Sequence, residues 1–181
     1  MAYKVLNNVQ LKDATGVSSL TTDMLVLVIN KNTKNDSSFM ELNKKSKNYL
    51  SKTIKSHVDQ TGSSILLPKI DGINAKHILL VKGLDKDAPT HKWLSLYQSI
   101  AQKGNQNKCK DISVMPGTVS PKGKDELWLI EMVSKTIESN VYIFSETKNK
   151  TSKKPSVKKL TILTTGLTGS KLTKAKQAAK V

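Results

Sequence analysis

The sequence predicts an α/β fold in which helices cover both faces of a mixed or mostly parallel sheet. Strand-like apolar runs alternate along the chain with amphipathic, helix-like segments, an order typical of α/β proteins. Residues 21–30, TTDMLVLVIN, are almost continuously apolar, as in a strand that is buried on both faces. The 181 residues suffice for one substantial core, and they contain no internal repeat.

The first third of the chain predicts two strands and a long helix. Residues 3–11 are weakly strand-like, and residues 21–30 are strongly so. Ser38 and Glu41 have the spacing of a capping box, in which the two side chains satisfy free backbone donors at a helix start. Apolar residues then recur at nearly helical intervals, which predicts one amphipathic helix from about Ser38 to Val58.

Two short strands are predicted next, at residues 64–67 and 77–81, separated by proline and Asp-Gly turn residues. The second strand ends in VKGLDK, where Gly83 either brings a backbone N–H near an anion or only turns the chain. A single glycine is weak evidence for a phosphate site. We therefore expect a tight turn.

The second half of the chain continues the alternation. Trp93, Tyr97 and Ile100 share one helical face, and Gly104 is the expected end of their helix. Residues 111–117 predict a short strand, and a second strong helix should begin near Asp125. The remaining segments are a basic loop at 145–159, a last strand at 160–165, and a tail of helix-forming residues whose apolar face is too small to fold alone.

Charge is the most unusual feature of the composition. All 30 basic residues are lysine, against 14 acids, and residues 145–181 contain ten of these lysines and a single acid. Such an excess attracts polyanions, but without arginine any nucleic-acid binding should be salt-sensitive and weakly selective. Solvated charge without a partner is the alternative. The candidate nucleic-acid contacts are Lys148, Lys150, Lys153, Lys154, Lys158 and Lys159.

No pattern in the sequence predicts a catalytic or metal-binding residue. The three histidines lack ligand spacing, and no phosphate-binding glycine motif or nucleophile elbow occurs. The glycines of residues 164–171, TTGLTGSK, offer either an anion site or a turn. Cys109 lies between two lysines, which predicts a somewhat lowered pKa, but no partner base accompanies it, which favours a structural thiol.

The sequence also indicates the cellular compartment in which the protein is found. A single cysteine excludes an internal disulfide framework and suits a reducing environment. No apolar run approaches the roughly 20 residues needed to span a bilayer, and the first residues lack the apolar stretch of a secretory signal. We expect a cytoplasmic protein without membrane contact.

The chain resembles the N-terminal domain of the bacterial leucyl (cytosol) aminopeptidase family. The resemblance spans nearly the whole chain and rests on the order of its elements, including the helix with Trp93 and Tyr97, the tail LTKAKQAAKV and four further segments. These segments are TDMLVLVI, SSILLPKIDGINAKHILLVKGLDK, ELWLIEMVSKTIESNVYIFSETKNK and KKLTIL. Lys82 and Asp85 stand where the family often has glycine, which argues further against phosphate binding at that turn.

The resemblance implies a three-layer α/β/α, macro-domain-like N-terminal accessory domain over residues 1–166, followed by the start of a linker helix at 167–181. In the family, the linker leads to a catalytic domain that removes N-terminal residues from peptides with two divalent metal ions, zinc or manganese. That domain carries a catalytic arginine and an Asn-Thr-Asp-Ala-Glu-Gly-Arg motif. This chain contains neither the motif nor any arginine.

The resemblance therefore implies a non-catalytic domain whose first partner is its own catalytic domain. The family assembles as a homo-hexamer through the catalytic domain, so we expect this chain to be a monomer when alone. A lysine-rich, weakly selective DNA-binding module is the alternative function. Macro domains proper bind ADP-ribose through glycine-rich loops at strand ends, and the sequence shows no convincing equivalent of those loops.

Overall fold

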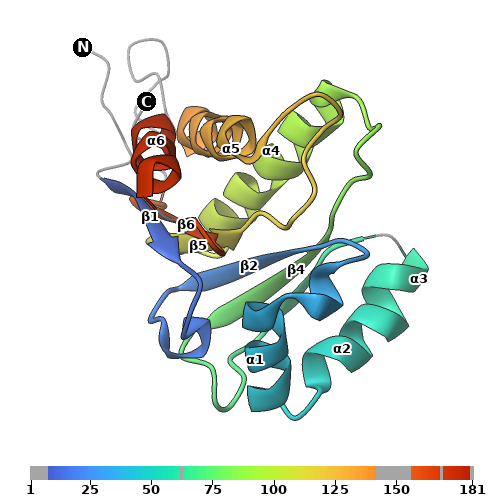
Figure 1. The fold of residues 1–181 in the computed structure, drawn as a ribbon. Helices are drawn as coiled ribbons and strands as arrows, with labels where there is room; N and C mark the ends of the chain where they lie inside the picture. Colours follow the sequence, from blue (N-terminus) through green and yellow to red (C-terminus); the bar gives the residue numbers. More distant parts are fainter. Residues whose placement is uncertain (1–7, 62, 142–155, 168, 180–181) are drawn as a thin grey trace, which may run out of the picture.

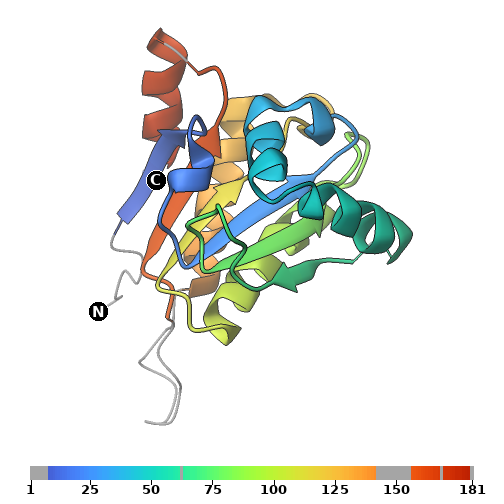
Figure 2. The same cartoon turned by 90° about the horizontal axis from the view of Figure 1, so that it is seen from below.

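The computed structural model describes residues 8–61, 63–141, 156–167 and 169–179, and the predicted α/β fold is confirmed there. The strands of these residues form one six-stranded sheet in the order β1-β6-β5-β2-β4-β3, which Figure 2 shows from below. The neighbours are parallel except for β3 and β4, which are antiparallel. The strands are β1 (Asn8–Asp13), β2 (Met24–Ile29), β3 (Ile65–Leu67), β4 (His77–Lys82), β5 (Asp111–Met115) and β6 (Lys159–Thr164).

Helices cover both faces of the sheet (Figure 1). One layer consists of α1 (Ser37–Lys45), α2 (Tyr49–Thr53), the π-helical turn η3 (Ile54–Val58) and α3 (Asp59–Thr61). The other layer consists of α4 (Thr90–Gln106), α5 (Glu126–Val141) and α6 (Gly169–Ala179). Two 3₁₀ turns, η1 (Val17–Ser19) and η2 (Thr33–Asn35), flank β2. None of the helices in the described ranges is long and apolar enough to cross a bilayer.

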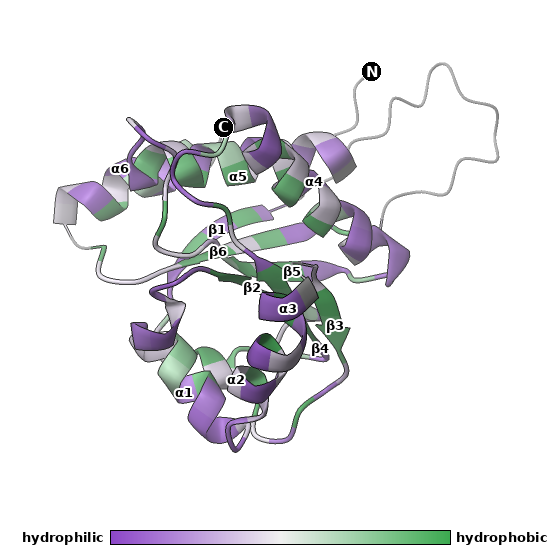
Figure 3. Ribbon diagram, turned by 90° about the vertical axis from the view of Figure 1, so that its right-hand side faces the viewer, coloured by the Kyte–Doolittle hydropathy of each residue, from purple (hydrophilic) through white to green (hydrophobic). Residues whose placement is uncertain are grey.

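The core lies on both sides of the sheet, and β2 contributes to each side. All six of its residues are buried, as its unbroken apolar run predicts. Side chains alternate across a strand, so Met24, Val26 and Val28 pack toward α4 and α5, while Leu25 and Leu27 pack toward α1 and α2. Figure 3 shows the hydrophobic strands between the two helix layers.

The prediction of one helix from Ser38 to Val58 is wrong, although its apolar spacing is correct. The helix breaks after Lys45 because Lys47 and Asn48 adopt left-handed backbone conformations, with φ angles of 52° and 63°. Asn43 supports the break, because its side chain accepts a hydrogen bond from the Ser51 N–H and donates one to the Asn48 side chain. The apolar residues on both sides of the break, Leu42, Leu50, Ile54 and Val58, are buried against the same sheet face.

The capping-box prediction is also wrong. Asp36 caps α1, because its carboxylate accepts hydrogen bonds from the N–H groups of Ser38 and Phe39 at 2.9 and 3.2 Å. Glu41 instead accepts hydrogen bonds from the hydroxyl and the N–H of Ser18, which join η1 to α1. The bond from the Ser18 hydroxyl, more than any other contact, holds the pKa of Glu41 below its usual value.

Gly104 does not end its helix as predicted, since α4 continues to Gln106. A Cβ at this position would lie 2.3 Å from Cδ1 of Ile112, a buried residue of β5. Glycine therefore lets α4 approach the sheet closely.

The tail folds as α6, and neighbouring elements complete its small apolar face. Ala175 and Ala179 are buried, and the buried Ser134 hydroxyl of α5 donates a hydrogen bond of 2.8 Å to the Ala179 carbonyl. The helix contacts α5 and β1. This segment, which was predicted to be the start of a linker, is thus packed against α5 and β1.

Candidate functional site: a crevice at the carboxyl ends of the strands

A crevice of about 210 Å³ opens at the carboxyl ends of β5 and β6. Its position follows from the topology. The connection after β2 leads through α1 toward β4, whereas the connection after β5 leads through α5 toward β6, on the other side of the sheet. Neighbouring strands whose connections leave in opposite directions form the switch point at which open α/β sheets usually bind ligands.

Polar side chains line part of the crevice, and none of its lining residues in the described part of the chain is a lysine. Two carboxylates, Asp36 and Glu126, line it together with the hydroxyl groups of Thr118, Ser120 and Thr165. Partial burial raises the pKa of Glu126, while Lys171 acts in the opposite direction. The crevice therefore has two carboxylates in its lining, one of which caps α1 while the other lies close to a lysine.

Apolar side chains also line the crevice. Met115, Leu129 and Leu163 form its walls. A recess of about 20 Å³, lined by Leu27, Phe39 and other residues, adjoins the crevice and shares Asp36, Met115, Gly117 and Thr118 with it. The recess can hold roughly one water molecule or one methyl group.

The backbone after β5 is fixed by α4 and by Asn30. The buried hydroxyl of Tyr97 donates a hydrogen bond of 3.3 Å to the Pro116 carbonyl. Gly117 has a φ angle of 85°, and a Cβ there would lie 2.5 Å from the Asn30 side-chain oxygen. A Cβ at Gly83 would lie 2.3 Å from the same side chain, whose amide donates to the Leu84 carbonyl. Gly83 thus permits close packing around Asn30, as a tight turn requires.

The helix N-termini that border the crevice are already occupied by the chain's own carboxylates. Asp36 accepts from the first N–H groups of α1, and Asp125 accepts from the Trp128 N–H of α5 at 2.9 Å. Such N–H groups are what bind phosphate in many α/β proteins. A phosphate in this crevice would have to displace a carboxylate or lie beside one.

The six predicted nucleic-acid contacts lie at the other end of the sheet or outside the described residues. Lys148, Lys150, Lys153 and Lys154 are outside them. Lys158 is exposed and Lys159 is half-buried, and both donate backbone hydrogen bonds to the Lys110 carbonyl, at 2.8 and 3.2 Å. The structure thus places Lys158 beside Lys110, at the amino ends of β5 and β6.

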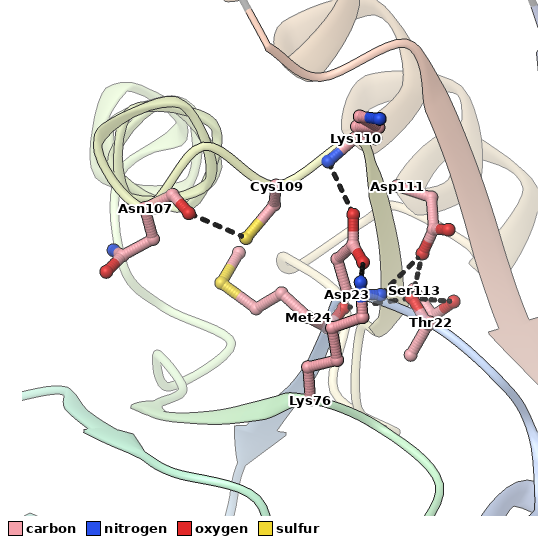
Figure 4. A network of polar contacts seen from close by, with 9 residues as sticks. All are labelled: Thr22, Asp23, Met24, Lys76, Asn107, Cys109, Lys110, Asp111 and Ser113. Atoms are coloured by element: carbon pink, nitrogen blue, oxygen red, sulfur yellow. Dashed lines mark hydrogen bonds and ion pairs between the residues drawn. The ribbon is translucent and has the colours of Figure 1, made fainter.

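A polar network holds this amino edge together (Figure 4). The Asp111 carboxylate accepts hydrogen bonds from the Asp23 N–H, at 2.8 Å, and from the Thr22 hydroxyl. The Asp23 carboxylate accepts from the Lys110 N–H and pairs with the Lys76 ammonium at 2.6 Å. These contacts connect the starts of β2 and β5 to the loop before β4.

Cys109 lies beside this network, and the prediction of a lowered pKa is wrong. The thiol is buried, and burial raises its pKa to about 11, with the carboxylates of Asp23 and Asp111 adding to the effect. The flanking lysines point their charges into solvent, where water screens them. The expected structural thiol is what the geometry shows.

The two kinds of site differ in how well the sequence reveals them. The lysines are evident from composition alone. The crevice is assembled from segments around residues 36, 115–120, 126 and 163–165, which share no motif. The sequence features that come nearest to revealing the crevice are the ends of two strands, at Pro116-Gly117 and Thr164-Thr165. Residues that follow the carboxyl ends of parallel strands gather at one edge of the sheet.

Comparison with known proteins gives one family. A family model described as the N-terminal domain of the cytosol aminopeptidase family matches residues 25–151. A probable cytosol aminopeptidase from Haemophilus influenzae is 26% identical over 134 residues, which are 72% of this chain and 27% of that protein. The chain therefore spans about a quarter of the length of the curated relatives it matches.

Solved structures show the same fold. A mutant of tomato leucine aminopeptidase superposes with a TM-score of 0.67 at 22% identity, over 98% of this chain and 36% of that chain. A Trypanosoma brucei macrodomain, solved with ADP and with ADP-ribose, gives TM-scores of 0.67 and 0.65 at 12% and 13% identity, over 97% of this chain and 71% and 70% of the respective macrodomain chains. The fold is macrodomain-like.

Proposed function

Because the chain belongs to the cytosol aminopeptidase family, through the N-terminal domain of that family, we propose that it is the non-catalytic N-terminal domain of a cytosolic leucyl aminopeptidase. The match over residues 25–151 carries this proposal. The similarity to a curated cytosol aminopeptidase over 134 residues, which are 27% of that protein, also supports the proposal.

The two metal ions that the family implies do not fit the residues that the structure describes. Among the described residues, no group of three histidine, cysteine, aspartate or glutamate side chains is placed to hold a metal ion. The two acids that line the crevice, Asp36 and Glu126, are accompanied by no histidine or cysteine in its described lining. A two-metal site needs several converging carboxylates, and we assign no catalytic step to these residues.

The proposal assigns residues 1–166 to the accessory domain and residues 167–181 to the start of the connection toward a catalytic domain. The burial of Ala175 and Ala179 supports a fixed starting direction for that connection. The first partner would be the chain's own catalytic domain, in a hexameric parent protein. The monomeric state of the chain alone stays a prediction, which analytical ultracentrifugation measures.

We predict that the purified chain does not hydrolyse leucine p-nitroanilide in the presence of added Mn²⁺ or Zn²⁺. The physical reason is the lack of converging metal ligands among its described residues. Release of p-nitroaniline is followed by absorbance, with a full-length cytosol aminopeptidase as the positive control. Turnover that rises in proportion to the concentration of the chain would contradict the proposal.

A weakly selective DNA-binding module is the second candidate, and the position of Lys158 beside Lys110 favours it. Both side chains are exposed at the amino edge of the sheet, next to the exposed Lys108. In the sequence, Lys158 closely follows the segment that contains the other predicted lysine contacts. DNA bound here would contact phosphates, because lysine without arginine cannot make the bidentate contacts that read guanine.

We predict that the logarithm of the association constant for unrelated DNA duplexes falls linearly with the logarithm of the salt concentration. The slope should be about 0.9 for each phosphate contacted. Replacing Lys110 and Lys158 with glutamine should reduce the slope by about two, whereas the same change at the exposed Lys52 and Lys55 should leave it nearly unchanged. Fluorescence anisotropy measures both. Equal losses in the two double variants, or no binding at low salt, would remove this candidate.

A further inference from the structure

We propose that the outer edge of β1 binds an extended, acidic polypeptide segment, which adds to the sheet as a further strand. The partner is recognised through its backbone and its negative charge. The proposal concerns the edge of the sheet opposite β3, and it rests on the pairing, the regularity and the charge of β1. It does not rest on the proposed function.

β1 is an edge strand in the described part of the chain. It is the first strand in the order β1-β6-β5-β2-β4-β3 and pairs there with β6 alone, at the dark-blue margin of the sheet in Figure 2. The backbone N–H and C=O groups of a strand alternate between its two sides. Half of those of β1 therefore point away from β6, toward the position that another strand would take.

The two edges of the sheet differ in how well they are protected. Natural sheets protect their edges with short strands, proline, bulges or charge. β3 has only three residues and is followed directly by Pro68. β1 has six residues without proline or glycine, and it pairs with β6 in an unbroken register from Asn8 to Asp13. A regular edge of this kind is what extended segments add to in β-augmentation.

A shallow groove of about 400 Å³ follows this edge. It is lined by residues 8–12 of β1 and by Lys176 of α6, a helix that contacts β1. Val9 and Leu11 are half-buried and pack toward the core on the α4 and α5 side of the sheet. Because paired residues of neighbouring strands share a face, apolar side chains of an added strand would extend this apolar row.

The charges at the edge favour an acidic partner. Lys12 and Lys176 are exposed, and no described residue of the groove lining is acidic. Asp13 is outside that lining, and its carboxylate accepts a hydrogen bond of 2.8 Å from the Thr15 N–H. A lysine on an edge strand disfavours pairing with another basic strand, so a second copy of this chain, with a formal charge of +16, is a poor partner. An acidic segment is attracted by the same charges.

The test uses a capped heptapeptide of alternating glutamate and valine with the 181-residue chain. In a ¹H–¹⁵N NMR titration, the peptide should shift the amide signals of Asn8–Asp13 in a saturable manner. Every second amide of β1 should also exchange more slowly with solvent, because only the outward N–H groups gain an acceptor. The corresponding peptide of lysine and valine should show no saturable binding, since the chain repels it.

A modified peptide separates backbone pairing from attraction by charge alone. The glutamate–valine peptide with every backbone nitrogen methylated keeps its side chains and charge but has no backbone donors. It should bind at least about tenfold more weakly, because several hydrogen bonds are lost together. Binding of the methylated peptide at equal strength would contradict strand addition.

Variants test the role of the two lysines. The double variant Lys12→Gln and Lys176→Gln should weaken binding of the acidic peptide about three- to fivefold, the effect of exposed ion pairs. The matched control is the same change at Lys52 and Lys55, exposed residues of α2 and η3, which should leave the affinity nearly unchanged. Both variants change only exposed side chains, so both should fold. Equal losses in the two double variants would contradict the proposal.

Three further outcomes would overturn the proposal. These are no shift of the β1 signals at millimolar peptide, saturable shifts confined to the lysines of the amino edge around Lys110, and β1 signals that shift with the concentration of the chain alone. The last result would show that a second copy covers the edge. None of these measurements depends on hydrolysis of leucine p-nitroanilide, so failure here and failure of the proposed function are separate observations.

Discussion

Replacing Trp93 with alanine is expected to lower the free energy of unfolding by about 3–5 kcal/mol, the usual range for a buried aromatic side chain. Trp93 is 1% exposed and lies in the core between α4 and the sheet, with Tyr97 and Ile100. Domains of this size are stable by about 5–15 kcal/mol, so the variant should be partly unfolded or close to it. Urea denaturation followed by far-UV circular dichroism measures the change.

Two further variants make this prediction sharper. The buried Nε1 of Trp93 has no hydrogen-bond partner in the described part of the chain, so Trp93→Phe removes an unpaired donor along with volume. It should cost much less than alanine, about 1.5 kcal/mol or below. Trp128 of α5 is half-buried, with the Lys124 ammonium 5.4 Å from its ring centroid, and is the matched control for the alanine change. A loss at Trp93→Ala no greater than that at Trp128→Ala would contradict the packing described here.

The second large effect is expected at the amino edge, where Asp111→Ala should cost about 2–3 kcal/mol. Its carboxylate accepts hydrogen bonds from the Asp23 N–H and the buried Thr22 hydroxyl, which itself accepts from Ser113. Removing the acceptor leaves these donors without their partner, and hydrogen bonds to charged groups contribute about 1.5–3 kcal/mol. Asp111→Asn keeps an acceptor and should recover about half of the loss. Equal costs for the two variants would argue against the network.

The stability of the folded chain should depend on pH through Asp23, which lies at the same edge of the sheet. Burial opposes ionisation of this carboxylate, but the Lys76 ammonium and the backbone N–H groups of Lys110 and Asp111 outweigh it and lower the pKa. A lowered pKa in the folded state means that the stabilisation is present above the ordinary aspartate range and is lost as pH falls through the folded pKa. Asp23→Asn should therefore be less stable than the natural chain at neutral pH, and the difference should shrink below about pH 4. A difference that grows with acid would contradict this assignment.

Much of the fold follows from the sequence because its strands are strongly apolar and its helices are periodic. β2 was predictable from six consecutive apolar residues, and α5 from its spacing and from Asp125 at its start. The break between α1 and α2 was not predictable. It depends on two non-glycine residues, Lys47 and Asn48, in left-handed conformations that hydrogen bonds from Asn43 support.

Competing hydrogen-bond and packing partners explain the wrong predictions for the capping box and for Gly104. Ser38 and Glu41 have capping-box spacing, but Asp36 is a nearer acceptor for the N–H groups and Ser18 is a better donor for Glu41. Gly104 has the composition of a helix end, but its role is to fit against Ile112. In each case a contact distant in sequence decides the outcome of a local pattern.

The crevice could not be predicted for the same reason. Asp36 and Glu126 are 90 positions apart in the sequence and share a site only because β2 and β5 are neighbours in the sheet. Charge counting along the sequence directs attention to the lysines of residues 145–181. It gives no indication that Asp36 and Glu126 line one crevice at the switch point of the fold.

The metal content of the chain after equilibrium dialysis against Zn²⁺ or Mn²⁺ is the most direct test of the account, because it does not depend on the choice of peptide substrate. With no converging ligand group among its described residues, the chain should retain clearly less than one ion per molecule, while a full-length cytosol aminopeptidase dialysed beside it retains its metal. Retention of two ions per chain, in proportion to the concentration of the chain, would show a metal centre here and would contradict the account.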